Sequence, residues 1–270
     1  MRKKGIWSLE FTGKLILALI VLGISMFMIK QIVTGTNTGY DKHLCKMSVI
    51  ANSKGRIAGT EFYTIRCPTR YVTIEQKKYT IEAKDASDEF DIECGNLVSD
   101  ESKQCFFDRT NWLISNILFD CWDQFAAGQL SVFSRYNQDR QCLICARIEF
   151  KDVPGSATAH SRNKLEHSLE EYMKTHNPVQ HRISYYEFIF DQTDAWPHKG
   201  MIYEYDLTHP MAVVFSSMNE NYFTSQISSA WDKVKTVAFK EPGSDREYQF
   251  VNALDFVRYD EVIEQCDALR

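Results

Sequence analysis

The stretch "LISNILFDCWDQF", Leu113–Phe125, carries the clearest helical pattern in the chain, and the strand-like "CLICARIEF", Cys142–Phe150, follows it after a short connection. In Leu113–Phe125, apolar residues recur at i, i+3, i+4, i+7, i+8 and i+11. They are Ile114, Ile117, Leu118, Cys121, Trp122 and Phe125. This spacing places them on one stripe of a helix, which faces a core. Asp108 or Thr110 would cap the start of the helix, and Gly128 suits its end. We therefore expect a buried helix packed on the strand that follows it.

The regions around these two elements are rich in strand-like patterns. Alternation is strand-like from Lys46 to about Lys84, and "RYVTIEQKKYTIEAK" within it predicts an antiparallel hairpin. A second helix is predicted over Ser161–His176, ending before Pro178. Further strand-like runs are Ile183–Phe190, Met201–Leu207, Met211–Ser217, Val234–Phe239 and Tyr248–Val257. Because strands and helices do not alternate strictly, the predicted fold class is α+β, rich in antiparallel sheet, with two main amphipathic helices.

Composition and turn signals predict four parts. The chain has 270 residues, of which 44% are apolar and 25% charged, as in ordinary globular proteins. We expect a membrane helix over residues 1–33, a small-polar linker over 34–41, a cysteine-rich α+β subdomain over 42–152 and a second α+β subdomain over 153–270. The segment "DASDEFDIECGNLVSDESKQC", Asp85–Cys105, is acidic and loop-rich. The net charge of −5, with acids and bases interleaved, gives no basic stripe, so a nucleic-acid partner is not expected.

An almost unbroken apolar run, Leu15–Ile29, lies near the N-terminus. Extended to Val33, it reaches the ~20 residues that a spanning helix needs. Arg2, Lys3 and Lys4 precede it, so the positive-inside rule predicts a cytoplasmic N-terminus and a single pass, with the rest of the chain extracytoplasmic at the cell membrane. A cleaved secretory signal is the alternative. The absence of a clear small-x-small cleavage site in "KQIVTGTNTGYD" favours a signal anchor.

The stretch "KKGIWSLEFTGK" ahead of the apolar run resembles a type IV pilin-like, or class III, signal peptide, and its "SLE" matches the archaeal form. The resemblance covers about the first thirty residues and implies cleavage between Gly5 and Ile6 by a prepilin peptidase. It further implies that Glu10, fifth in the mature chain, pairs with the N-terminal amine of a neighbouring subunit, since a carboxylate in a low-dielectric setting needs a cation. Lys14 departs from the family pattern. It lies four residues after Glu10, in the order that favours a local ion pair, so a plain signal anchor stays open as the second interpretation.

All eight cysteines follow the apolar run, and they are Cys45, Cys67, Cys94, Cys105, Cys121, Cys142, Cys145 and Cys266. In an oxidising exterior an even set predicts structural disulfides. Cys94 and Cys105 flank the acidic loop and are natural partners. Cys121, on the apolar stripe, should bond to Cys142 or Cys145, because residues three apart on a strand face opposite sides and only one of the two can face the helix.

The remaining three cysteines are not assigned partners from the sequence, although Cys266 would pin the C-terminus to the first subdomain. Catalytic and cofactor signals are weak. The Cys142–Cys145 pair lacks the helix start that a thiol-redox site needs and the second pair that a zinc site needs. His160, His167 and Glu171 would share a helical face, which by default is solvated.

The sequence therefore predicts a membrane-anchored extracytoplasmic structural or interaction protein, with no cofactor or metal assigned. It is a candidate pilin-like subunit or component of a cell-surface assembly. Its expected partners are the lipid bilayer and, through the N-terminal helix, like subunits or other envelope proteins. The alternative is an envelope thiol-redox or metal-dependent enzyme that uses Cys121, Cys142 and Cys145.

Overall fold

The computed structural model describes residues 13–17, 19–22, 37–54, 65–83, 86–94, 100–130, 132–133, 140–153, 168–190, 207–219, 236–240, 247–266 and 268–269. The chain divides into two compact units, Met1–Asp41 and Lys42–Arg270. In the first unit, residues 13–17 and 19–22 are helical. Among the described residues, no helix is both long and apolar enough to cross a bilayer. The predicted span from Leu15 to Val33 lies largely outside these residues.

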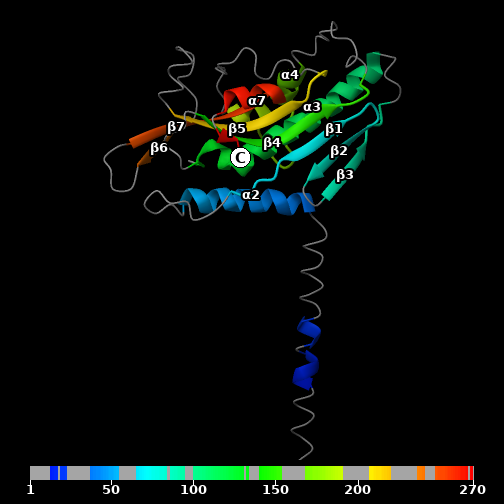
Figure 1. The fold of residues 1–270 in the computed structure, drawn as a ribbon. Helices are drawn as coiled ribbons and strands as arrows, with labels where there is room; N and C mark the ends of the chain where they lie inside the picture. The colour runs from blue at the N-terminus through cyan, green and yellow to red at the C-terminus, as the bar shows by residue number, and fades with distance from the viewer. Residues whose placement is uncertain are drawn as a thin grey trace, which may run out of the picture. The chain divides into compact units, whose positions relative to one another are not determined.

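One sheet organises the second unit. Its strands are β1 (Arg70–Ile74), β2 (Lys78–Ala83), β3 (Ala86–Asp91), β4 (Arg140–Phe150), β5 (Met211–Asn219), β6 (Thr236–Lys240), β7 (Glu247–Arg258) and β8 (Ala268–Leu269). They follow the order β3-β2-β1-β4-β5-β7-β6, and Figure 1 shows β3 and β6 at its opposite ends. The short β8 pairs with β4. Among the described strands, β1 pairs with β4 and β4 with β8 in parallel, and the other pairings are antiparallel.

The sheet confirms the predicted α+β class and its antiparallel character. The hairpin predicted within residues 70–84 is present as β1 and β2, with Val72 opposite Ile81. The subdomain boundary predicted between residues 152 and 153 falls between β4 and β5, which are neighbours in this sheet.

Helices cover both faces of the sheet. They are α2 (Asn37–Lys54), α3 (Asp100–Gln124), α4 (Ser168–Thr175), α5 (Tyr185–Phe190) and α7 (Tyr259–Gln265), with a short 3₁₀ turn, η1 (Ala126–Gly128), after α3. Buried side chains of α2, α3, α4 and α5 share one core with one face of β1, β4, β5 and β7. Val262 of α7 packs on the opposite face, against Cys142 and Val214.

The helix predicted from the quoted stretch is α3, and its apolar stripe is buried as predicted. Ile114, Leu118 and Phe125 are fully buried, and Phe125 stacks on Phe215 of β5 with ring centroids 4.0 Å apart. The predicted start was wrong, because α3 begins at Asp100, so Asp108 and Thr110 lie inside it. The buried positions Phe106 and Thr110 extend the stripe toward the N-terminus, beyond the stretch in which it was predicted.

Residues 37–54 correct two further predictions. The small-polar linker predicted over 34–41 and the strand-like pattern predicted from Lys46 are replaced, over Asn37–Lys54, by the helix α2. Cys45, Val49 and Asn52 are its buried residues, and their i, i+4, i+7 spacing is that of one helical face.

The predicted strand Ile183–Phe190 is also wrong, because Tyr185–Phe190 is the helix α5. Its start is a capping box. The backbone N–H of Glu187 donates to the Ser184 hydroxyl at 3.0 Å, and the backbone N–H of Ser184 donates to the Glu187 carboxylate at 3.1 Å. These bonds satisfy two N–H groups that a helix start leaves without partners, which outweighs the strand propensity of the aromatic run.

The other predicted elements are found in part. The second helix is present over Ser168–Thr175, while residues 161–167 lie outside the described residues. The strands predicted near the C-terminal half are β5, β6 and β7, and residues 201–206 of the run Met201–Leu207 lie outside the described residues. The acidic segment predicted as loop contributes β3 and the first turns of α3.

A left-handed turn ends the central helix. Ala126, Ala127 and Gly128 have φ angles of 52°, 51° and 69°. Ala126 and Ala127 carry a Cβ, which makes a positive φ angle unfavourable for them. Contacts with the rest of the structure must therefore stabilise the turn. The Asn252 amide of β7 does so, donating at 3.0 Å to the backbone carbonyls of both Gly128 and Leu130. The end of α3 is thereby fixed to the sheet.

Gly128→Ala should lower the free energy of unfolding by about 3 kcal/mol. The φ angle is unfavourable for alanine, and the added Cβ would lie 2.4 Å from the ring of Trp122. Urea unfolding measures the change. Gly13→Ala is the matched control, since its Cβ meets no atom within 4 Å. An unchanged unfolding midpoint in Gly128→Ala would contradict this account of the turn.

Candidate functional site

All eight cysteines form disulfides. The pairs are Cys45–Cys67, Cys94–Cys105, Cys121–Cys145 and Cys142–Cys266. The Cys94–Cys105 pair is the one that the sequence predicted, and Cys145 is one of the two partners predicted for Cys121. Cys266 joins the C-terminus to β4, within the predicted first subdomain.

Cys142 and Cys145 bond on opposite sides of the sheet because they lie three residues apart on β4, and a bulge in the strand follows at Cys145. Ile144 pairs with Val214 and Ala146 with Val213, so Cys145 is the extra residue of the bulge. Cys145 and Ala146 both face the core that contains α3, whereas Cys142 faces α7. The strand is therefore bonded to α3 on one face and to the residue that follows α7 on the other.

In this arrangement each cysteine of the cluster is part of a disulfide. No cysteine is free, so none supplies the thiolate that nucleophilic attack or zinc binding requires. The described residues contain no group of three or more His, Cys, Asp or Glu side chains that could hold a metal ion. His160 and His167 lie outside the described residues, and Glu171 is exposed on α4.

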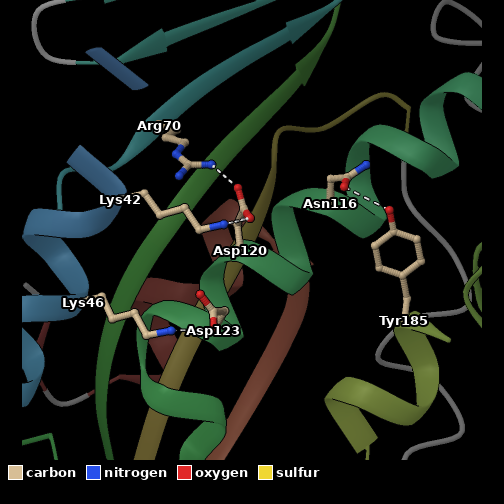
Figure 2. A network of polar contacts seen from close by, with 7 residues as sticks. All are labelled: Lys42, Lys46, Arg70, Asn116, Asp120, Asp123 and Tyr185. Carbon is tan, nitrogen blue, oxygen red and sulfur yellow. Dashed lines mark hydrogen bonds and ion pairs between the residues drawn. The ribbon is translucent and has the colours of Figure 1, made fainter. Parts of the chain in front are cut away.

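A charged network joins α2 and β1 to the central helix (Figure 2). The Lys42 ammonium and the Arg70 guanidinium both donate to the carboxylate of Asp120, and the Arg70 distance is 3.1 Å. One turn further on, the Lys46 ammonium donates to Asp123 at 2.7 Å. The five side chains are partly buried, between 18% and 36% exposed. Three cations face two carboxylates, so the network attaches α2 to α3 and leaves one positive charge in excess.

One turn before Asp120 on α3, Asn116 holds Tyr185 of α5. The amide nitrogen of Asn116 donates to the backbone carbonyl of Trp112 at 2.8 Å, which turns its oxygen toward the Tyr185 hydroxyl. That hydroxyl donates to the oxygen at 2.9 Å. Burial, with the nearby Tyr172 hydroxyl and the Asp120 carboxylate, raises the pKa of Tyr185 to about 12. The phenol therefore keeps the proton that this bond requires.

A buried ion pair lies on the face of the sheet that α7 covers in part. The Arg140 guanidinium donates to the Asp255 carboxylate at 2.6 Å, and the two side chains are 10% and 4% exposed. The Ser216 hydroxyl donates to the same carboxylate oxygen at 3.0 Å. These three residues come from β4, β7 and β5, so the cluster cross-links three adjacent strands. A buried pair of this kind favours one strand register over its alternatives.

These polar networks were not predicted from the sequence, although part of the signal is present there. Lys42 and Lys46 are four residues apart, as helical neighbours are, and Asp120 and Asp123 lie off the apolar stripe of α3. Nothing in the sequence pairs Arg140 with Asp255, because 115 residues separate them. The candidate processing residues Gly5, Ile6 and Glu10 lie outside the described residues.

Comparison of the chain with protein-family models, with curated proteins and with solved structures finds no match in any of the three. The site must therefore be interpreted from its own geometry. Within the described residues that geometry is one of attachment, in which disulfides and ion pairs hold helices to a sheet.

Replacing both cysteines of a pair by alanine should destabilise the second unit more when the bond closes a longer loop, with a cost that rises as the logarithm of loop length. The Cys142–Cys266 bond spans 124 residues and the Cys94–Cys105 bond spans 11. In the chain-entropy model, their removal costs about 5 and about 3 kcal/mol respectively. Urea unfolding of the two double variants tests the order. A larger loss from the short loop would show that packing around the bond, rather than chain entropy, sets its contribution.

Asp120→Asn should lower the free energy of unfolding by about 1–2 kcal/mol, since it leaves both Lys42 and Arg70 without their carboxylate. Asp123→Asn is the matched control. It loses a single partner, Lys46, and should cost under ~1 kcal/mol. The difference between the variants should shrink in high salt, because the network is partly exposed. Equal losses at all salt concentrations would contradict the shared-carboxylate geometry.

Tyr185→Phe should make the loss of stability at high pH less steep. The folded pKa of about 12 lies above the ordinary value of 10.0, so the folded state binds the proton more tightly. The resulting stability is complete below pH 10 and is lost as the pH rises toward 12. Urea unfolding at a series of pH values measures the slope, and Tyr71→Phe, on an exposed ring, is the control. A slope equal to that of the parent chain would refute the prediction.

Proposed function

We propose that the chain is a membrane-anchored extracytoplasmic interaction protein, whose disulfide-bonded α+β unit is presented outside the cell. The observation that carries the proposal is the use of every cysteine in a disulfide. Disulfides of this kind persist in oxidising compartments, whereas the cytosol keeps thiols reduced. The basic N-terminal residues ahead of the apolar run support the same orientation.

The anchor of this proposal is the apolar segment 15–33. Its described apolar side chains are 49–65% exposed, and they are Leu15, Ile16, Leu17, Leu19, Ile20, Val21 and Leu22. A soluble protein rarely presents consecutive large apolar residues to water, because their burial is favourable by about 1.5–3 kcal/mol each. Lipid is the environment that satisfies such a surface around a helix.

A pilin-like role is the more specific form of the proposal. It rests on the resemblance of the first thirty residues, in which Gly5 and Ile6 flank the cleavage site and Glu10 follows. In this form the N-terminal helix binds like subunits as well as lipid. In the simpler form Glu10 pairs with Lys14 in the headgroup region, and the chain remains a single-pass anchor.

The enzymatic alternative needs a free thiolate at Cys121, Cys142 or Cys145. The first is bonded to the third, and Cys142 is bonded to Cys266, so two separate bonds would have to be reduced before the cluster had three thiols. A bond between Cys142 and Cys145, which a thiol-redox site would use, is not formed. The disulfide geometry therefore favours a structural role for the cluster.

The intact mass of protein extracted from its native membrane tests the proposal. Reduction should add two hydrogens for each of the four disulfides, eight in all. Protease added to intact cells should digest the region after Tyr40. Protection of that region until lysis, or eight free thiols before reduction, would overturn the extracytoplasmic location.

The same mass decides between the two forms of anchor. Loss of Met1–Gly5 supports the pilin-like form, in which Glu10→Ala should impair assembly but leave cleavage intact. Lys14→Ala is the matched control for Glu10→Ala. In the simple anchor the two variants break the same local pair and should behave alike, and the mature chain should keep its first five residues.

A further inference from the structure

The edge of the sheet at β3 combines three features that no structural role accounts for together. Within the described residues β3 pairs with β2 alone, so its outer side presents backbone N–H and C=O groups without a neighbouring strand. Exposed carboxylates line it, and an exposed aromatic ring lies among them. An open edge is a template on which another extended chain can pair.

The aromatic rings form a continuous series from this edge to the central helix. Phe90, 43% exposed, stacks on Tyr79 with ring centroids 5.0 Å apart. Tyr79 in turn lies 6.5 Å from the ring of Trp112, which is 37% exposed. Tyr79 itself is buried and supports the two outer rings. Exposed Trp and Phe on a rigid support are typical of the residues that dominate binding at interfaces.

The charges of β3 define what can pair with it. Side chains alternate along a strand, so Asp88 and Phe90 face the α3 side of the sheet while Glu89 and Asp91 face the other. Of these carboxylates only Glu89 has an ion pair within the described residues, with Lys78 of β2 at 3.4 Å and with both side chains well exposed. The edge therefore has one face with the two carboxylates of Glu89 and Asp91 and another on which Phe90 lies beside Asp88.

We infer that β3 is a docking edge for an extended segment of a partner protein in which basic and apolar residues alternate. The segment adds to the sheet as a further strand. Its Lys or Arg side chains lie over Glu89 and Asp91, and its apolar side chains lie over Phe90 and Trp112. The inference rests on the proposed function, an interaction protein, and names the surface and the partner class.

Protection of the edge against self-association is the simpler explanation of its acidic residues, since like charges oppose the pairing of two β3 strands. That explanation does not account for Phe90. A polar residue there would protect the edge better, whereas an exposed phenylalanine among carboxylates makes the edge attractive to a chain that is both basic and apolar. The same carboxylates thus exclude a second copy and admit a basic partner.

The probe is a synthetic peptide of alternating lysine and valine with blocked ends, titrated into the full chain in detergent micelles. Binding should be measurable by calorimetry and should change the fluorescence of Trp112, identified as the part of the signal that disappears in Trp112→Phe. A peptide with a central proline should not bind, because proline removes a backbone donor and breaks the pairing.

Paired charge reversals provide the decisive variants. Glu89→Lys with Asp91→Lys should weaken binding at least about tenfold. Glu101→Lys with Glu264→Lys, both at exposed helix positions, is the matched control and should leave the affinity unchanged. Each pair changes the net charge from −5 to −1, since each reversal adds two charges, so a general attraction between acid and base cannot explain a difference.

Equal affinity of the two double variants would overturn the inference, as would failure of the peptide to bind. Concentration-dependent dimerisation that the β3 reversal alters would also overturn it, because the occupant would then be a second copy. These measurements are made in detergent and do not depend on membrane orientation, so a negative result here leaves the proposed location to be judged by its own test.

Discussion

The structure of the second unit depends on how β4 is held. This strand lies in the middle of the sheet, with β1 and β8 along one side and β5 along the other. It is bonded on one face to α3 through Cys145 and on the other to Cys266 after α7. Alternation along β4 places Cys142 and Cys145 on these two faces, and the bulge at Cys145 turns Ala146 toward the core as well. A shift of one residue in β4 would exchange its faces and break both attachments at once.

The polar networks also hold elements in place on both faces of the sheet, and they include strands and helices beyond β4. Arg140, at the start of β4, reaches across the sheet to Asp255 of β7, and Ser216 of the strand between them joins the same carboxylate. On the opposite face, the Asp120 carboxylate of α3 accepts hydrogen bonds from Lys42 of α2 and from Arg70 of β1. Each interaction links elements that are distant in sequence. The core supplies most of the stabilisation, and these contacts select one arrangement of it.

Local patterns in the sequence predicted some elements and missed others for identifiable reasons. The stripe on α3 and the hairpin of β1 and β2 were predicted because a single period dominates each. The helix α2 was missed because small polar residues at its start are typical of a linker, and α5 because its aromatic run hid the Ser184–Glu187 capping box. Strand geometry left Cys142 and Cys145 as the two possible partners of Cys121. The choice between these two cysteines depends on which side of β4 faces α3. The packing of the whole sheet determines that side.

The disulfide connectivity also bears on how the chain reaches its native state. Three of the bonds join cysteines that are consecutive or nearly so, while Cys142 must wait for Cys266, which lies 124 residues later. In a chain that emerges N-terminus first, Cys142 would meet Cys121 before Cys145 does. Pairing in order of emergence would then give a wrong Cys121–Cys142 bond. The native set is reached only if α3 packs on β4 before oxidation, or if thiol–disulfide exchange later moves that bond to Cys145.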